Sequence, residues 1–278
     1  MQTLEFGSIT VDAISDGELA LAVARMFPDL DVEAARRLGG IDEQDNALVP
    51  LTTFVIRAGG QVILVDTGIG PDFGSLAFLG AGRPVGLLPA ALAAAGIELA
   101  AVNAVVSTHL HADHIGWNVT DNAAGSRPLF PNARYIVTRV DWENRLTIAG
   151  EDTAKRCLDP IQESGQLTLV EDGYRVVAGV ELLGTPGHTP GHASVLISDG
   201  GVGGVITGDA AHHPIEMEQP ELLAAFDSDP AQSAASRRAL VERVEAEGLI
   251  VMGGHFPPPT AGRVVRVEQK RRWQWLGA

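Results

Sequence analysis

The chain has 278 residues, of which 45% are hydrophobic and 20% charged, and its formal net charge at pH 7 is −15. This composition is typical of a folded globular protein and excludes a disordered one. The acidic balance also argues against a nucleic-acid partner, because phosphate contacts need a basic surface, and the single cysteine, Cys157, excludes an intrachain disulfide.

Short runs rich in branched residues predict strands, and longer polar-apolar patterns between them predict helices. In chain order, the expected strands are Leu51–Ala58, Gln61–Asp66, Ala104–Thr108, Arg134–Thr138, Val180–Gly184, Ala193–Ser198, Gly204–Thr207 and Leu249–Gly253. The expected helices are Asp31–Leu38, Leu87–Ala95, Val140–Leu146 and Ala231–Glu247. Because strands alternate with helices, the pattern predicts a layered α/β protein. We find no linker, so residues 1–278 are expected to form a single domain.

Two glycine-containing stretches, Gly68–Pro89 and Gly116–Pro131, predict long loops. The basic run Lys270–Arg272 is expected to be a solvated end of the chain. Acidic residues interrupt the first twenty positions, so we expect no signal peptide, and no apolar stretch is long enough for a membrane span. These features predict a cytoplasmic protein with no membrane partner, and they leave open whether it is a monomer or a homodimer.

The stretch THLHADHIGW, at Thr108–Trp117, places three imidazoles and a carboxylate within six residues, directly after a predicted strand. Three more candidates each follow another predicted strand: His188 in GTPGHTPGH, Asp209 in TGDAAHH and His255 in MGGHF. Loops that follow neighbouring strands often meet at one edge of a sheet scaffold. We therefore expect these side chains to lie together.

Imidazole nitrogen and carboxylate oxygen are the ligands that zinc takes where no thiolate is present. The candidates are too many for one ion and divide into two sites, one with three histidines and one with two aspartates and two histidines. They are His109, His111, Asp113, His114, His188, Asp209 and His255. The sequence thus predicts two zinc ions, with iron, manganese or cobalt as alternatives.

The motif THLHADH followed by PGH, GD and GGH resembles the metallo-β-lactamase-fold hydrolase superfamily, whose motif is His-x-His-x-Asp-His followed by His, Asp and His. The motif VDTG at Val65–Gly68 also matches, and the resemblance extends from about Phe54 to His255. It implies a four-layer αββα sandwich with metals at one edge of its sheets. It further implies that the first zinc is held by His109, His111 and His188, and the second by Asp113, His114 and His255, with Asp209 bridging.

This ligand set implies a hydrolase in which a hydroxide bridging the two metals is the nucleophile, because zinc lowers the pKa of bound water from about 15.7 to about 7. Asp113 and Asp209 are the expected catalytic carboxylates. Asp209 is expected to orient the nucleophile and pass its proton to the leaving group. A non-heme iron or manganese oxidoreductase and a non-catalytic metal-binding module are the alternatives from other functional classes.

The expected substrates are small, rather apolar esters or lactones, with promiscuous phosphotriester hydrolysis. The segments Gly208–His213, Phe226–Arg238 and Gly253–Pro259 resemble methyl-parathion-hydrolase-like esterases and phosphotriesterases. An N-acyl-homoserine-lactone lactonase proper is an alternative, although such enzymes often hold a tyrosine near the metals, and Tyr135 and Tyr174 both lie on predicted strands. A thioester hydrolase is another.

Several residues beside the ligand motifs are candidates for the substrate pocket, with core packing as the alternative role for each aromatic one. They are Trp117, His212, His213, Phe226 and Phe256, with Phe27, Phe73 and Phe78 from predicted loops. Asp66 is expected to orient a ligand histidine or to form a turn. His192 is expected to pack in the core or to support a ligand.

Overall fold

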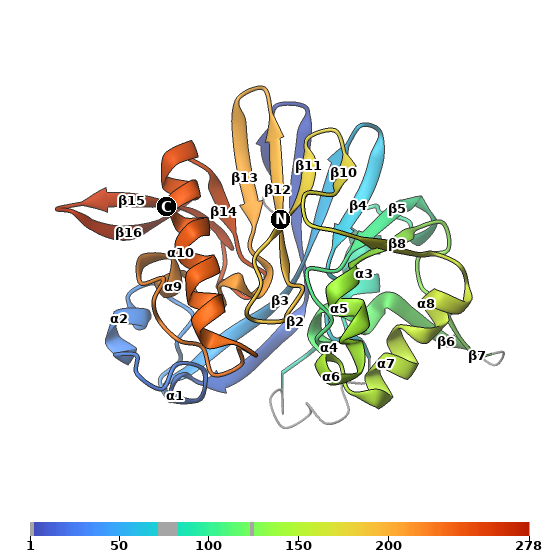
Figure 1. The fold of residues 1–278 in the computed structure, drawn as a ribbon, viewed down its shortest axis with the longest axis horizontal. Coiled ribbons are helices and arrows are strands. Elements are labelled where there is room, and N and C mark those ends of the chain that lie inside the picture. The colour runs from blue at the N-terminus through green and yellow to red at the C-terminus, as the bar shows by residue number, and fades with distance from the viewer. Residues whose placement is uncertain (1–2, 72–82, 123–124, 278) are drawn as a thin grey trace.

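The computed structural model describes residues 3–71, 83–122 and 125–277, and within them two seven-stranded sheets pack face to face (Figure 1). The first sheet has the order β1 (Thr3–Phe6), β2 (Ile9–Ala22), β3 (Asn46–Ala58), β4 (Gln61–Val65), β5 (Val102–Val106), β8 (Arg134–Thr138), β9 (Leu167–Val170). The second has the order β10 (Arg175–Val177), β11 (Val180–Gly184), β12 (Ala193–Asp199), β13 (Val202–Ile206), β14 (Ile250–Met252), β15 (Ala261–Val267), β16 (Lys270–Trp275).

Helices cover the outer face of each sheet, which gives the expected αββα layers. Those of the first sheet are α3 (Leu88–Ala94), α4 (Ala112–Ile115), α5 (Arg139–Glu143), α6 (Arg145–Ile148), α7 (Glu151–Cys157) and α8 (Asp159–Glu163). Those of the second are α2 (Val32–Arg36), α9 (Pro214–Glu218) and α10 (Pro230–Glu247), and α1 (Val23–Met26) follows β2. None of the helices in the described ranges is long and apolar enough to cross a membrane.

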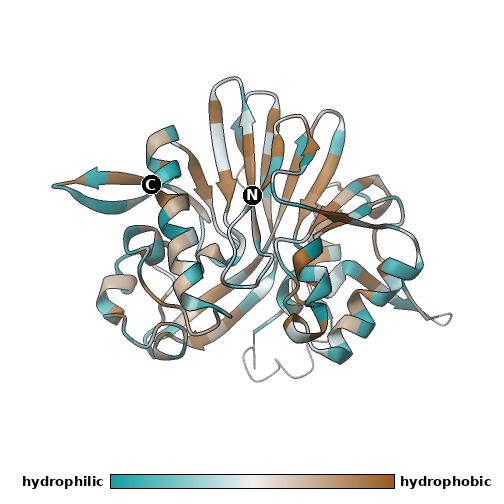
Figure 2. Ribbon diagram, in the orientation of Figure 1, coloured by the Kyte–Doolittle hydropathy of each residue, from teal (hydrophilic) through white to brown (hydrophobic). Residues whose placement is uncertain are grey.

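The strands read as continuous apolar runs because both of their faces are buried. Neighbouring residues of a strand point to opposite faces, so Phe54 and Ile56 enter the layer between the sheets. Val55, between them, packs outward against Leu88 and Leu92 of α3. Figure 2 shows this pattern as hydrophobic strands at the centre and helices with hydrophilic outer surfaces.

The direction of the strands brings the ends of several of them to one edge. β4, β5, β8 and β9 are parallel neighbours in the first sheet, and β13 runs parallel to β14 in the second. The loops after β4, β5, β13 and β14 therefore leave from carboxyl ends, where sites on open sheets form.

All eight predicted strands are confirmed, as is the αββα fold class. The expected helix Val140–Leu146 is instead two short helices, α5 and α6. The predicted loop Gly116–Pro131 is wrong in part, because it contains the hairpin of β6 (Val119–Asn122) and β7 (Gly125–Pro128).

The prediction of a solvated end at Lys270–Arg272 is wrong in part, since these residues open β16 and only Lys270 is exposed. Arg271 Nη2 lies 3.0 Å from Glu245 Oε2 of α10, and Arg272 Nη1 lies 3.3 Å from Glu218 Oε2 of α9. The two ion pairs attach the strand to the helices that cover its sheet.

A buried carboxylate, Asp16 of β2, connects the first sheet to the chain around α3. Its oxygens accept hydrogen bonds from the backbone N–H of Ile69 (2.8 Å), Gly70 (3.3 Å) and Leu88 (2.7 Å), and from Nε1 of Trp117 (2.8 Å). Burial raises the pKa of Asp16, although the four donors act in the opposite direction. The carboxylate thus satisfies backbone donors that no sheet or helix satisfies.

We expect Asp16→Ala to lower the free energy of unfolding by at least about 3 kcal/mol, because it leaves several buried donors without an acceptor. Denaturant unfolding followed by circular dichroism measures this loss. The matched control is Asp29→Ala, an exposed aspartate, for which we expect a change within about 0.5 kcal/mol. Equal stabilities of the two variants would contradict this account of Asp16.

Candidate metal centre and substrate cavity

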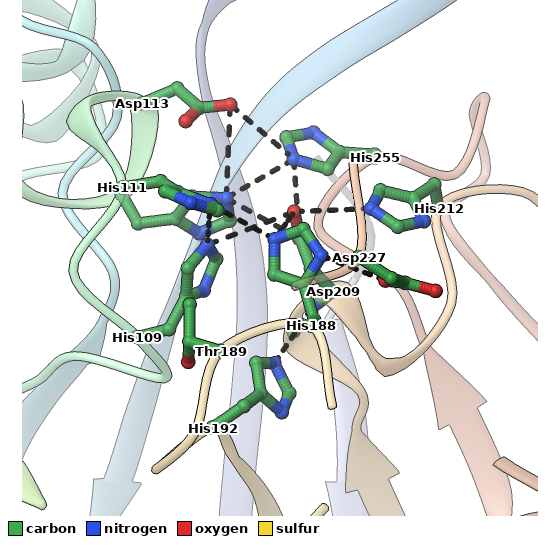
Figure 3. Close-up of polar contacts among 12 residues, drawn as sticks. His109, His111, Asp113, His188, Thr189, His192, Asp209, His212, Asp227 and His255 are labelled. Atoms are coloured by element: carbon green, nitrogen blue, oxygen red, sulfur yellow. Dashed lines mark hydrogen bonds and ion pairs between the residues drawn. The ribbon is translucent and has the colours of Figure 1, made fainter. Parts of the chain in front are cut away.

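The seven predicted ligand residues lie together at the edge of the sandwich (Figure 3). His109 and His111 follow β5, and Asp113 and His114 lie in α4, whose N-cap is His111. The other three come from the second sheet, after β11, β13 and β14: His188, Asp209 and His255.

Four of these side chains form a first group around one small volume. Nε2 of His109 lies 3.0 Å from Nδ1 of His111, which lies 2.9 Å from Nε2 of His188. Nε2 of His188 is in turn 3.2 Å from Oδ2 of Asp209. Three imidazole nitrogens and one carboxylate oxygen thus converge.

The second group lies on the other side of Asp209. Nε2 of His114 and Nε2 of His255 are 3.2 Å apart, and each is 3.3 Å from Oδ1 of Asp209. Oδ2 of Asp113 lies 3.6 Å from Nε2 of His255 and 3.8 Å from Nε2 of His114. Asp209 therefore presents one carboxylate oxygen to each group.

The outer ring nitrogens show where the imidazole protons lie. Nδ1 of His188 is 3.0 Å from Oδ1 of Asp227, and Nδ1 of His255 is 2.7 Å from the carbonyl oxygen of Pro50. Both oxygens are placed to accept a hydrogen bond, so each Nδ1 carries a proton and each Nε2 faces the site.

Asp66, which follows β4, orients the rings of His114 and, through Thr108, His109 in the same way. Its Oδ2 lies 2.8 Å from Nδ1 of His114 and accepts a hydrogen bond from the hydroxyl of Thr108 at 2.9 Å. With its proton so directed, the Thr108 oxygen accepts from Nδ1 of His109 at 3.1 Å. Sequence reasoning left open whether Asp66 orients a ligand or forms a turn, and the structure places it against a ligand ring.

This donor set fits two divalent cations. Nε2 of His114 and Nε2 of His255 face each other at 3.2 Å, and each lies 3.3 Å from Oδ1 of Asp209, whereas both Nδ1 atoms have acceptors of their own. Oδ1 of Asp209 is buried and has no hydrogen-bond partner among the described residues. Nitrogen and carboxylate ligands with orienting partners behind them are the usual surroundings of zinc.

The electrostatics of the two groups differ. Burial lowers the pKa of His109 well below its usual value, and burial together with His188 lowers that of His111 to about 4. Burial also acts to lower the pKa of His114, but the carboxylates of Asp209, Asp66 and Asp113 outweigh it and raise that pKa well above its usual value. The rings of His109 and His111 are therefore neutral, whereas the second group attracts a positive charge.

A cavity of about 320 Å³ opens onto both groups. Its polar part holds His111, Asp113, His188, Asp209, His212 and His255, and its other walls are Leu19, Leu21, Met26, Val49, Ala112, Ile148, Ala149, Thr153 and Phe226. A polar end with apolar walls is typical of a site for a small organic ligand.

The structure brings two of the predicted pocket residues, His212 and Phe226, into this lining. Trp117, His213 and Phe256 are not among the described residues that line it, and their prediction is corrected. Trp117 donates to Asp16, His213 caps the N-terminus of α9, and Phe256 is fully buried edge-to-face against Trp273.

The remaining aromatic candidates are also placed. Phe27 is buried, with its ring centroid 6.4 Å from that of His212, and Phe73 and Phe78 lie outside the described residues. The hydroxyl of Tyr135 donates to the carbonyl oxygen of Asn118, and that of Tyr174 accepts from Arg134. Neither tyrosine lines the cavity described above.

Sequence reasoning missed the residues that support the ligands from behind. Asp227 orients His188, and Arg237 of α10 is fully buried against Asp227 and Glu216. The segment FDSD, noted for its resemblance to esterases, contains Asp227. No sequence signal distinguishes Arg237 from the other charged residues of its helix.

Two loop contacts hold His188 and Asp209 in position. Nε2 of His192 accepts a hydrogen bond from the backbone N–H of Asp209 at 2.9 Å, and burial lowers the pKa of His192 to about 3, so the ring is neutral. Asp141 accepts from the Thr189 hydroxyl (2.8 Å) and from the N–H of Gly191 (2.6 Å), on the loop that carries His188.

Comparison with known proteins agrees with this geometry. The family model described as the Metallo-beta-lactamase superfamily matches residues 48–120 and 136–255. A protein of Bacillus sp named N-acyl homoserine lactonase is 38% identical over 152 residues, which are 54% of this chain and 54% of that protein. The match therefore spans about half the length of the curated relatives.

Solved structures align over more of the chain. AidC, described as a dizinc quorum-quenching lactonase, covers 98% of this chain and 96% of its own, with a TM-score of 0.82 and 20% identity, and so shows the fold. An N-acyl homoserine lactone hydrolase with N-hexanoyl-L-homoserine at its catalytic metal center aligns at a TM-score of 0.68 and 26% identity, covering 88% of this chain and 92% of its own.

Burial raises the pKa of Asp141 from 3.8 to about 6. Between these values the folded protein binds the proton that the unfolded chain has released, so Asp141 stabilises the fold at low pH and this contribution is lost as pH rises through about 6. We expect the stability of the wild type relative to Asp141→Asn to fall by about 2 kcal/mol between pH 4 and pH 7.

Urea unfolding of both proteins across this range measures the difference. Asp152→Asn, at an exposed position of α7, controls for the loss of one carboxylate. A difference between wild type and Asp141→Asn that does not change with pH would contradict the assignment.

Proposed function

The chain belongs to the metallo-beta-lactamase superfamily, and we propose that it is a metal-dependent hydrolase that opens lactones of small, rather apolar molecules. N-acyl homoserine lactones are the first candidates, because the relatives that match this chain carry that activity in their names. Phosphotriester and thioester hydrolysis are outcomes that the test below distinguishes.

The observation that carries the proposal is the pair of ligand groups that share Asp209 at the polar end of an apolar cavity. Bound there, two divalent cations supply Lewis acidity and an activated water. Zinc is the first candidate for this nitrogen and oxygen donor set, with iron, manganese or cobalt as alternatives.

The chain's own residues supply position and proton transfer. Opening a lactone forms a bond from the carbonyl carbon to the oxygen of water and breaks the bond to the ring oxygen, which must gain a proton. Asp113 and Asp209 are the carboxylates in the cavity lining, which supports the proposal that they carry that proton. The apolar walls, among them Leu21, Met26 and Phe226, hold an acyl chain and keep water away from it.

We expect the purified protein to hold about two divalent cations per chain, and removal by a chelator to abolish hydrolysis and lower the thermal unfolding midpoint. His111→Ala removes a ligand nitrogen and is expected to lower kcat/KM by at least about 100-fold. This loss is larger than the loss in kcat/KM expected when a residue that only orients a ligand is removed. Metal analysis of wild type and variant, before and after reloading, measures this. Normal turnover by a metal-free sample would refute the metal role.

The substrate proposal is tested with a panel of N-hexanoyl homoserine lactone, unsubstituted γ-lactones, aryl esters, thioesters and a phosphotriester. We expect the highest kcat/KM for lactones that carry an acyl chain, because the apolar walls lie beside the ligand groups. The catalytically dead His111→Ala protein controls for background hydrolysis. Hydrolysis confined to thioesters or phosphotriesters would overturn the substrate class.

A further inference from the structure

His212 lines the cavity, and no residue that the structure describes forms a hydrogen bond with either ring nitrogen. The residue is 4% exposed, and neither Nδ1 nor Nε2 has a hydrogen-bond partner among the described residues. Its ring lies between Phe27 and Phe226, with centroids 6.4 and 6.5 Å away. Leaving a buried polar group without a hydrogen bond costs about 1–3 kcal/mol, so a cavity-lining imidazole whose nearest carboxylate oxygens are 3.5 Å away indicates an acceptor that arrives with the ligand.

The side chain is held by a buried charged cluster rather than by loose packing. Oε2 of Glu216 accepts the backbone N–H groups of His212 (2.5 Å) and His213 (3.0 Å). Nη2 of Arg237 lies 3.0 Å from Oε1 of Glu216, and its Nε donates to the carbonyl oxygen of Ala210 at 2.6 Å. The turn that carries His212 is thereby fixed from behind, and its ring is directed toward Asp209 (Figure 3).

Each ring nitrogen of His212 has a carboxylate beside it. Nδ1 of His212 lies 3.5 Å from Glu216 Oε2, an oxygen that two backbone N–H groups already occupy. Nε2 lies on the cavity side, 3.5 Å from Oδ2 of Asp209, which belongs to the first ligand group. A carboxylate beside each ring nitrogen favours a proton on each, so Nε2 presents an N–H on the cavity side, and with Asp209 engaged by metal this N–H is free to donate.

We propose that His212 is a catalytic residue whose Nε2–H donates a hydrogen bond to an oxygen of the substrate's ester group. The inference rests on the proposed function, since the acceptor is the lactone that the cavity is proposed to bind. A fixed donor beside an oxygen that gains negative charge stabilises the transition state more than the ground state.

The test compares His212→Leu, which removes the donor, with His212→Gln, which keeps an N–H on a side chain of similar reach. Each metal-loaded protein is analysed for metal content, for kcat and KM with N-hexanoyl homoserine lactone, and for binding of the ring-opened acid N-hexanoyl-L-homoserine by calorimetry. His213→Asn is the control, because His213 is a buried neighbour whose ring already contacts Gly39 and Ile215.

We expect His212→Leu to keep its metals and to lose about 100-fold to 1,000-fold in kcat, with a smaller change in KM. N-hexanoyl-L-homoserine should bind to His212→Leu at least about tenfold more weakly than to the wild type. His212→Gln should recover most of the loss in kcat and most of the loss in binding. Rates of wild type and His212→Leu within about threefold would overturn the proposal. Loss of metal from His212→Leu would overturn it in favour of a ligand role, and a His212→Gln protein as weak as His212→Leu would refute the donor.

The binding measurement separates this inference from the proposed function. A wild type that binds the acid more tightly than His212→Leu but hydrolyses no lactone refutes the lactonase and keeps His212 as the donor. If His212→Leu does not fold, His212→Phe takes its place, because an aromatic ring suits the space between Phe27 and Phe226, and the same expectations apply.

Discussion

The shared carboxylate of Asp209 is the contact on which the rest of the site depends. Its two oxygens face two sets of imidazole nitrogens, and almost all of these groups are withdrawn from water. Burying so many polar atoms is costly unless each is paired or bound to a cation. Positive charge on both sides of Asp209 would satisfy the converging nitrogen atoms and the buried carboxylate oxygen at once, and the donor set fits such charge.

The supporting contacts come from parts of the chain that are far apart in sequence. Asp66 lies after β4, Pro50 in β3 and Asp227 before α10, and each fixes the ring of a different ligand histidine. Ring orientation is therefore set only when both sheets are in place. Arg237 lies behind these contacts and places its positive charge against two buried carboxylates, Glu216 and Asp227.

The apolar walls of the cavity come from different elements of the chain than its polar end. Leu19 and Leu21 come from the end of β2, Met26 from α1, Ile148 from α6 and Phe226 from the segment before α10. Polar chemistry at one end and apolar contact at the other suit a molecule with a reactive carbonyl and an apolar chain. His212 lies where the two parts meet.

The sequence by itself determined the strands whose two faces are buried and the ligand residues that follow them, because both signals are local. A run such as that of β5 is apolar throughout, and the spacing His-x-His-x-Asp-His is contained in six residues. It did not reveal β2, where Asp12 and Asp16 interrupt the apolar pattern. Their partners, Arg57 for Asp12 and backbone groups beyond β4 for Asp16, are distant in sequence.

The cavity walls and the orienting partners were decided only by the tertiary structure. Phe256 follows a ligand residue directly yet points into the core, and His213 differs from His212 by one position yet caps a helix. Leu21, Ile148 and Asp227 become neighbours of the site only when strands and loops from both halves of the sandwich pack together. The spacing of residues along the chain predicts which side chains bind metal or take part in catalysis. The direction in which each side chain points depends on packing between elements that are distant in sequence.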